Sequence, residues 1–268
     1  MRTSRWTALL AVAAVALAGC SGATSTPTVA PTAVPTPTPT PATVTVAYEG
    51  NCQVELMDSS GRRILIDVYD PTLLTSPARA TDILLTTHTH SDHYLESFEQ
   101  SFPGKKITNK TTELNVGDIR IKSISASHSD APIDPVDPSN HIFVIDFDGF
   151  RIVHGGSTGQ LQLTSDQLTA IGSHVDIAAM VLINTGGLDP KDEKAMNLIK
   201  QVNPKLLIPT HFSLDTMKAA GKTMPATFSA KKTVTIPRDQ LPAQMSLLIL
   251  GNHAGDFGTI LSAPESTW

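Results

Sequence analysis

Seven residues that follow a short apolar run constrain this chain more than any other feature. The run at residues 83–85, Ile-Leu-Leu, is typical of a buried strand that ends in a turn. Residues 87–93, Thr-His-Thr-His-Ser-Asp-His, come next. Side chains alternate in an extended segment, so His88 and His90 point the same way and can hold one metal ion from a single short loop.

The second part of this motif can serve another ion. If Ser91 caps the helix that residues 94–98 suggest, then Asp92 and His93 lie in its opening turn and point toward a second ion. Imidazoles this close together would repel one another when protonated. The imidazoles and the carboxylate would also lose their hydration with nothing in return, unless a cation bound between them. The motif therefore predicts half of a metal site, and an ordinary polar loop is the alternative interpretation.

Residues 1–19 predict where the protein is sent. Arg2 and Arg5 precede an uncharged apolar stretch, and small residues lead up to Cys20, which is the pattern of a secretory signal peptide and is too short for a membrane span. Leu-Ala-Gly-Cys resembles a bacterial lipobox, which implies a lipid such as palmitate on Cys20 at the mature N-terminus. An ordinary signal peptide with a coincidental cysteine is the alternative. We expect a secreted protein anchored by this lipid alone, on the periplasmic or cell-surface side of a bacterial membrane.

The composition divides the rest of the chain into a stalk and one folded domain. Residues 20–43 begin with Cys20 and are rich in Pro, Thr, Ser, Ala and Val, so they favour an extended polyproline stalk. Residues 44–268 are long enough for one domain with a full core. The net charge of −5 and the aromatic content of 5% argue against a nucleic-acid partner. The other cysteine, Cys52, is interpreted as a small core residue.

Short apolar runs separated by turns predict a mainly β structure with a few helices. The opening runs and the pair around Asp148-Gly149 suit antiparallel hairpins, and the strand-helix-strand order in the second half suits a crossover unit. We expect strands at residues 44–48, 52–56, 63–67, 112–116, 119–124, 142–145, 151–153, 177–183, 205–212, 228–236 and 245–250. We expect helices at residues 165–171 and 190–202.

The pattern His-x-His-x-Asp-His after a hydrophobic strand resembles the signature of the metallo-β-lactamase superfamily, and the similarity extends over nearly all of the folded part. In its lactonase-like branch, which includes L-ascorbate-6-phosphate lactonase-like proteins, a comparable opening carries Gly-His and an Ile-Asp-Pro turn. Gly50-Asn51 and Asp67 stand in similar places here. The resemblance implies an α/β (α+β) fold, namely the four-layered αβ/βα metallo-β-lactamase sandwich.

The resemblance also implies a set of metal ligands. His128 follows a predicted strand, where the superfamily places a third imidazole, and His211 lies in Ile-Pro-Thr-His, which resembles the closing Ile-Pro-x-His motif. One ion would be held by His88, His90 and His128, and the other by Asp92, His93 and His211. Imidazole-rich sites suit zinc best, so two zinc ions are expected and Mn²⁺ or Fe²⁺ are less favoured.

The sequence departs from the family pattern at one ligand. Most members end the corresponding strand in Gly-Asp, whose carboxylate bridges the two ions, whereas Ser157 follows Gly156 here. Two ions can remain without a protein bridge, as in a metallo-β-lactamase subclass with a serine near the second metal, or one ion binds tightly, or the site is degenerate. Ser157 can hydrogen-bond the attacking water, and His154 can orient a ligand. The remaining histidines, expected at the surface or in turns, are His141, His174 and His253.

These features predict a metal-dependent hydrolase that acts on a small-molecule ester, lactone, amide or phosphoester. The ions would lower the pKa of a shared water, and the resulting hydroxide would attack an acyl or phosphoryl centre while Asp92 steers its proton. Two oxidative families are discounted, because flavodiiron proteins usually have glutamate in place of His90 and persulfide dioxygenases use the aspartate that is Ser157 here. The alternatives are a non-catalytic metal-binding surface lipoprotein with a degenerate site and a β-lactamase-like enzyme with a serine at the bridging position. No sequence pattern specifies the substrate or the oligomeric state.

Overall fold

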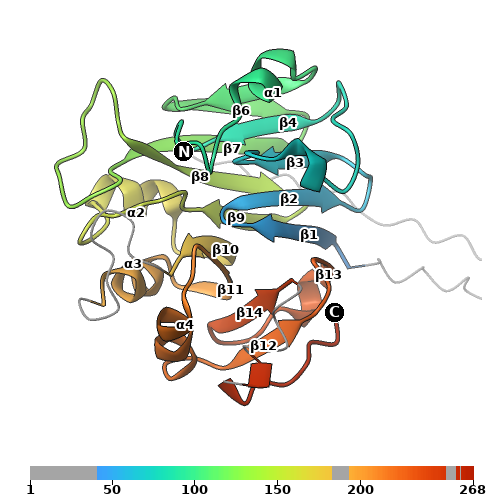
Figure 1. Cartoon of the computed structure of the whole chain (residues 1–268), viewed down its shortest axis with the longest axis vertical. Coiled ribbons are helices and arrows are strands. Elements are labelled where there is room, and N and C mark those ends of the chain that lie inside the picture. The colour runs from blue at the N-terminus through green and yellow to red at the C-terminus, as the bar shows by residue number, and fades with distance from the viewer. Residues whose placement is uncertain (1–40, 183–192, 252–257, 260) are drawn as a thin grey trace, which may run out of the picture. The chain divides into compact units, whose positions relative to one another are not determined.

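Two β-sheets packed face to face form the centre of the computed structural model, which describes residues 41–182, 193–251, 258–259 and 261–268 (Figure 1). The six-stranded sheet contains, in spatial order, β13 (Thr233–Pro237), β1 (Thr43–Gly50), β2 (Gln53–Asp58), β3 (Arg63–Ile66), β4 (Ile83–Thr86) and β5 (Lys105–Thr108). The eight-stranded sheet contains β12 (Ala226–Ser229), β14 (Ser246–Leu250), β11 (Pro204–Thr210), β10 (Val175–Val181), β9 (Phe150–His154), β8 (Asn140–Phe147), β7 (Ile119–Ala126) and β6 (Thr112–Val116). The described helices are α1 (Glu96–Ser101), α2 (Ser165–Ile171), α3 (Lys194–Val202) and α4 (Leu214–Gly221), with short 3-10 turns at η1 (Pro71–Leu73) and η2 (Arg238–Gln240).

Three apolar clusters join these elements into four layers. The largest cluster lies between the sheets and includes Val46 and Leu56 from one sheet and Phe143 and Leu206 from the other, all buried. A second cluster packs the outer face of the eight-stranded sheet against α2, α3 and α4. A third, which includes Phe102, lies between α1 and the outer face of the six-stranded sheet. The order helix, sheet, sheet, helix confirms the predicted α/β (α+β) class and the four-layered αβ/βα sandwich (Figure 1).

The strand that leads into the metal motif is buried on both faces. All four residues of β4 are buried, as are those of its neighbour β3, because one face of the sheet packs on the other sheet and the opposite face is covered by α1. This explains why residues 64–66 and 83–85 are continuous apolar runs without alternation. The metal motif therefore begins directly after a strand that is buried on both faces and paired on both sides.

The strand directions bring several chain segments to one edge of the sandwich. β3 and β4 are parallel, and so are β9, β10 and β11. β7 has the direction of β9, because both are antiparallel to β8. The carboxyl ends of β7, β9, β10 and β11 consequently lie at the same edge of the eight-stranded sheet, which is where open α/β sheets place their functional residues.

Most predicted strands are confirmed, and one is wrong. The opening meander and the β8–β9 hairpin form as expected, and the turn residues Asp148 and Gly149 of the hairpin both have positive φ. The single strand predicted at 228–236 is wrong. This segment contains parts of β12 and β13, which pair in different sheets, so the chain crosses from one sheet to the other between them.

The predicted helix after the metal motif begins later than expected. α1 starts at Glu96, and no side chain caps its first turn. The N–H of His93 donates to the carbonyl of His90 at 2.9 Å, which closes a tight turn through the intervening residues. Ser91 is therefore part of this turn and does not cap the helix, so that prediction is wrong.

The predictions for the N-terminal part fall outside the described residues. They concern the signal peptide at 1–19, the lipid on Cys20 and nearly all of the stalk at 20–43. The helix predicted at 190–202 is described only over α3. Across the described ranges, no helix has both the length and the apolarity needed to cross a membrane.

Candidate metal centre

The metal motif lies at the edge where parallel strands of both sheets end. β4 leads into residues 87–93, β7 leads to His128, and β11 leads to His211. Their side chains approach one another because the carboxyl ends of these three strands meet at this edge, although the residues are far apart in the sequence. The structure brings together at this edge the side chains of all six predicted ligands, His88, His90, Asp92, His93, His128 and His211.

The first cluster consists of His88, His90 and His128. One ring nitrogen of each lies within 4.8 Å of the others, and the ring centroids are 4.6, 5.1 and 4.8 Å apart. His88 is buried and His90 is exposed, so the cluster opens to solvent on one side. Zinc–nitrogen bonds of about 2.0–2.1 Å separate two ligand nitrogens by roughly 3.3 Å, so small side-chain rotations allow the three imidazoles to hold one ion.

His88 shows most clearly that a ligand is missing from its hydrogen-bond network. Its Nδ1 lies 3.0 Å from the Oγ1 of Thr87, which lies 2.8 Å from a carboxylate oxygen of Asp67. Since a carboxylate only accepts, Thr87 donates to Asp67 and accepts the Nδ1–H of His88, which leaves a lone pair on Nε2. This Nε2 is buried and has no hydrogen-bond partner among the described residues. Such an atom is costly unless a cation completes it, so the site fits a metal ion.

Three of the clustered imidazoles are held in the neutral form. Burial, followed by the neighbouring His93, lowers the pKa of His88 to about 2. Burial and then His90 lower the pKa of His128. Burial and then His93 lower the pKa of His211 to about 4. These side chains therefore offer unprotonated nitrogens near neutral pH, which is the state that binds a metal.

The second cluster is built around His93. Its Nε2 lies 3.1 Å from the Nε2 of His211 and 2.9 Å from the Oγ of Ser157. A carboxylate oxygen of Asp92 lies 4.0 Å from the Nε2 of His93 and 3.8 Å from that of His211. The rings of His88 and His93 have centroids 3.9 Å apart, so the two clusters adjoin. This arrangement can hold two ions close together.

Asp67, which follows β3, fixes the orientation of His93. Its carboxylate accepts the Nδ1–H of His93 at 2.8 Å, and also the N–H and the hydroxyl of Thr87 at 2.7 and 2.8 Å. Burial by itself raises the pKa of this carboxyl, but His93, His154 and the Thr87 N–H together hold the pKa below its ordinary value. The ionised carboxylate keeps the proton of His93 on Nδ1 and directs the Nε2 lone pair toward the cluster.

Ser157 stands where the resemblance expects a bridging carboxylate. It is buried, and its N–H donates to the Oδ1 of Asn140 at 3.1 Å. The preceding Gly156 has φ +54°, and a Cβ added there would lie 2.8 Å from the Cβ of Thr87. The turn is thus packed directly against the metal motif, and it presents a neutral hydroxyl in place of a charged ligand.

His154 lies behind the second cluster. It is buried, its Nε2–H donates to the carbonyl of Cys52 at 3.1 Å, and its Nδ1 accepts the N–H of Gly156 at 3.2 Å. Its Nδ1 also lies 3.9 Å from a carboxylate oxygen of Asp67. His154 therefore holds two backbone segments in place and lies on the far side of Asp67 from His93 in a chain of polar contacts.

The other histidines differ from one another. The prediction that His141 lies at the surface or in a turn is wrong. It is fully buried, and its Nδ1–H donates to the carbonyl of Thr87 at 3.0 Å, because β8 begins beside the metal motif. His174 is 54% exposed and pairs with Asp176, in agreement with the expected surface position. His253 lies outside the described residues.

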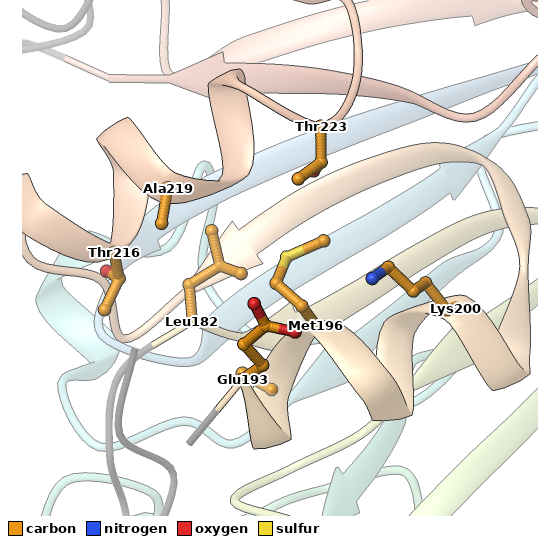
Figure 2. Close-up of a pocket in the computed structure, with 8 residues that line it drawn as sticks. Leu182, Glu193, Met196, Lys200, Thr216, Ala219 and Thr223 are labelled. Carbon is orange, nitrogen blue, oxygen red and sulfur yellow. The ribbon is translucent and has the colours of Figure 1, made fainter. Parts of the chain in front are cut away.

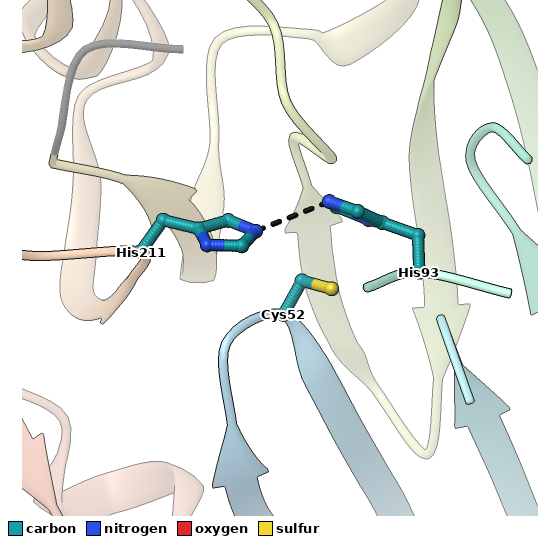
Figure 3. Close-up of side chains that lie close together, drawn as sticks. All are labelled: Cys52, His93 and His211. Carbon is teal, nitrogen blue, oxygen red and sulfur yellow. Dashed lines mark hydrogen bonds between the residues drawn. The ribbon is translucent and has the colours of Figure 1, made fainter. Parts of the chain in front are cut away.

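Sequence patterns alone do not reveal two of the residues at this site. Asp67 directly follows β3; the resemblance matches it to the opening of the family without giving it a role, and a charged residue after a buried apolar run is a weak indication of a buried partner. Cys52 is buried, in agreement with its interpretation as a core residue, but its sulfur lies within 4.8 Å of ring nitrogens of His93 and His211 (Figure 3). A lone cysteine beside a turn carries no spacing signal that could indicate this position.

A separate cavity of about 90 Å³ lies between α3 and α4 (Figure 2). Glu193 and Lys200 contribute one charge of each sign to its lining, and Leu182 and Met196 contribute apolar surface. The N–H of Leu182 donates to the carbonyl of His211 at 3.1 Å, so the cavity adjoins the strand end that carries this residue. Its described lining contains none of the predicted ligands, so the candidate chemistry lies in the histidine clusters.

Comparison with known proteins identifies the family of this chain. The model of the beta-lactamase superfamily domain matches residues 45–211, more than half of the 268 residues, and ends at His211. A UPF0173 metal-dependent hydrolase of Thermoplasma acidophilum is 27% identical over 211 residues, which cover 69% of this chain and 92% of that protein. A UPF0173 metal-dependent hydrolase of Thermococcus onnurineus is 28% identical over 202 residues, which cover 63% of this chain and 85% of that protein.

A solved structure shares the fold. It is that of a candidate zinc-dependent hydrolase of the metallo-beta-lactamase superfamily from Thermotoga maritima. Its TM-score is 0.58 at 20% sequence identity, and the alignment covers 78% of this chain and 98% of that one. The family match and the two facing sheets agree on one assignment. This chain belongs to the beta-lactamase superfamily, and it has the metallo-beta-lactamase fold.

Proposed function

We propose that this protein is a hydrolase that uses two metal ions, with zinc as the best-suited metal. One ion would be held by His88, His90 and His128, and the other by Asp92, His93 and His211. The buried Nε2 of His88 carries this proposal, because it has no hydrogen-bond partner among the described residues and a cation would complete it. The relatives named metal-dependent hydrolases support the same assignment.

The chain contributes orientation and proton transfer to the reaction. Ions bound at such a site lower the pKa of a coordinated water and polarise the oxygen of the group to be cleaved. The side chain of Asp92 is 47% exposed and close to both His93 and His211, so it can contact the second ion and can also accept a proton on the solvent side. Ser157 lies on the buried side, where its hydroxyl can position a water by hydrogen bonding.

The site also supports the lactonase-like branch and a small-molecule substrate. Asp67 holds His93, and the carbonyl of Asn51 accepts the N–H of His211 at 3.0 Å, so both positions that resemble the opening of that branch contact the site. The exposed His90 leaves the first cluster open to molecules from solution. We therefore favour a small ester or lactone, with amides and phosphoesters as other candidate substrates.

A non-catalytic metal-binding protein is the second candidate function. The neutral hydroxyl of Ser157 favours it, because the second ion then has a single carboxylate, Asp92, among the three predicted ligands. A β-lactamase-like enzyme with this serine is a variant of the first proposal and differs from it only in the substrate.

Metal analysis combined with turnover separates these functions. We expect two equivalents of metal and hydrolysis of a generic ester, lactone, β-lactam or phosphodiester, with hydrolysis abolished in His90→Ala. His90 is exposed, so this variant should fold. His174→Ala, an exposed histidine away from the site, is the control and should retain activity. Fewer than about half an equivalent of metal, or two equivalents with no turnover of any of the four substrates, would favour the binding protein.

We further propose that the domain at 44–268 is tethered outside the cytoplasmic membrane through a lipid on Cys20. The signal peptide at 1–19 and the Pro/Thr-rich stalk at 20–43 support this location, with the membrane contacted only through the lipid. Labelled palmitate should be incorporated into the full chain in bacteria, and not into Cys20→Ser. A Cys20→Ser protein that still carries the label would contradict the lipidation site.

A further inference from the structure

The second cluster contains a fourth potential metal ligand, Cys52, from the turn between β1 and β2. Its sulfur and one ring nitrogen each of His93 and His211 lie within 4.8 Å of one another. Figure 3 shows the sulfur beside the gap that the two imidazoles face, with the cysteine entering from the start of β2 and the histidines from the other sides. Zinc–sulfur bonds of about 2.3 Å and zinc–nitrogen bonds of about 2.0 Å are compatible with such a group after small side-chain rotations.

The position of Cys52 is tied to the metal loop on both its side chain and its backbone. Its thiol donates to the carbonyl of Asp92 at 3.0 Å, and its own carbonyl accepts the Nε2–H of His154 at 3.1 Å. The preceding Asn51 accepts the N–H of His211. A cysteine that served only to fill the core would contact apolar side chains, whereas this thiol faces the groups that surround the candidate ion.

Burial, followed by the carboxylates of Asp67 and Asp92, raises the pKa of the Cys52 thiol, so a thiolate forms at this point only if a cation binds beside it. The ligands Asp92, His93 and His211 carry one negative charge between them, because the expected second carboxylate is replaced by Ser157. A thiolate restores the missing charge and raises the number of protein ligands from three to four, which is the number of a closed tetrahedral zinc site, so the open position for water would lie on the first ion with its three imidazoles. It also favours zinc over manganese, because thiolates are soft ligands.

We propose that Cys52 is the fourth protein ligand of the second ion and replaces, from the β1–β2 turn, the carboxylate that the chain lacks at Ser157. On binding, the S–H bond breaks, its proton passes to solvent, and a sulfur–metal bond forms with no change of oxidation state. The hydrogen bond from the thiol to the carbonyl of Asp92 is released at the same time. This inference rests on the proposed function, since it requires that a metal binds at the second cluster.

Titration with Co²⁺ tests the proposal, because a thiolate–cobalt bond gives a near-ultraviolet charge-transfer band that imidazole and carboxylate ligands do not give. The experiment uses the full chain with Cys20→Ser, so that Cys52 is the only thiol. We expect two equivalents of Co²⁺, a charge-transfer band that belongs to one of them, and loss of this band in an added Cys52→Ser. The affinity of one site should fall by more than the roughly 10- to 100-fold typical of residues that only orient ligands.

Two further variants locate the band. His211→Ala should abolish it, whereas His128→Ala should lose one equivalent of cobalt and keep the band. Two equivalents of cobalt without a charge-transfer band would overturn the role of Cys52 and leave the proposed function intact. Less than half an equivalent of cobalt would overturn the proposed function, and this inference with it. The spectrum of the full chain that carries only Cys20→Ser decides between these outcomes even if the added Cys52→Ser prevents folding.

Discussion

Asp67→Asn is the most informative single change, because it alters the charge of a buried residue without altering its size. One carboxylate oxygen accepts the N–H of Thr87, and the other accepts the Nδ1–H of His93. An asparagine has one oxygen and one NH₂ group in their place. If its oxygen faces Thr87, its NH₂ forces the lone pair of His93 onto Nδ1 and puts a proton on Nε2, the atom that faces the candidate ion. If the amide is reversed, two N–H groups face each other at Thr87.

The magnitude follows from these two arrangements. Groups that orient metal-bound histidines typically contribute 10- to 100-fold to affinity, which corresponds to about 1.4–2.7 kcal/mol. A buried donor left without an acceptor costs roughly a further 1–3 kcal/mol in the free energy of unfolding. We therefore expect the second-site metal affinity of Asp67→Asn to fall by about one to two orders of magnitude, with a loss of stability of similar energy.

Isothermal titration of the metal-free protein with Zn²⁺, together with urea denaturation, measures both quantities. Asp176→Asn is the matched control, because Asp176 is equally buried and accepts the N–H of Arg151 at 3.0 Å, but lies at the start of β10, away from the metal motif. It should lose stability and keep its zinc affinity. Equal zinc affinities in Asp67→Asn and Asp176→Asn would refute the proposed tautomer control of His93.

Three further predictions concern pH, packing and charge at the same edge. Burial lowers the pKa of His88 to about 2 and that of His211 to about 4, below the unfolded value of about 6.5, so the unfolded chain binds protons first as the pH falls. The free energy of unfolding of the metal-free protein, measured by urea denaturation, should therefore fall by roughly 2 kcal/mol per histidine between about pH 6.5 and about pH 5. Unchanged stability would contradict the burial of these histidines as neutral groups. Gly156→Ala should lower the free energy of unfolding by roughly 1–3 kcal/mol more than Gly149→Ala. Both glycines have positive φ, but only at Gly156 would the added Cβ lie 2.8 Å from Thr87. Equal losses would mean that Thr87 moves away at no cost. Ser157→Asp should raise the affinity for the second ion in zinc titrations relative to Ser157→Asn, and equal affinities would place residue 157 outside its reach.

Much of the first half of the site could be predicted from local sequence. Residues 83–85 form a buried strand because their apolar run is covered on both faces, and His88 and His90 follow it at the spacing that lets two imidazoles approach. The hairpin at Asp148-Gly149 likewise follows from local turn chemistry. The start of α1 could not be predicted, because a hydrogen bond between backbone groups of His93 and His90 competes with capping by a side chain.

The sequence by itself therefore determined the features that depend on neighbouring residues, namely the apolar strands, the tight turns and the histidine spacing of the metal motif. Only the tertiary structure decided that Asp67 holds His93, that His141 is buried against Thr87, and that the thiol of Cys52 faces two imidazoles. The physical reason is that each of these contacts joins segments that are far apart in the sequence and that lie at the ends of different strands. Strand direction and register set such contacts, and these result from packing two whole sheets together rather than from any local pattern.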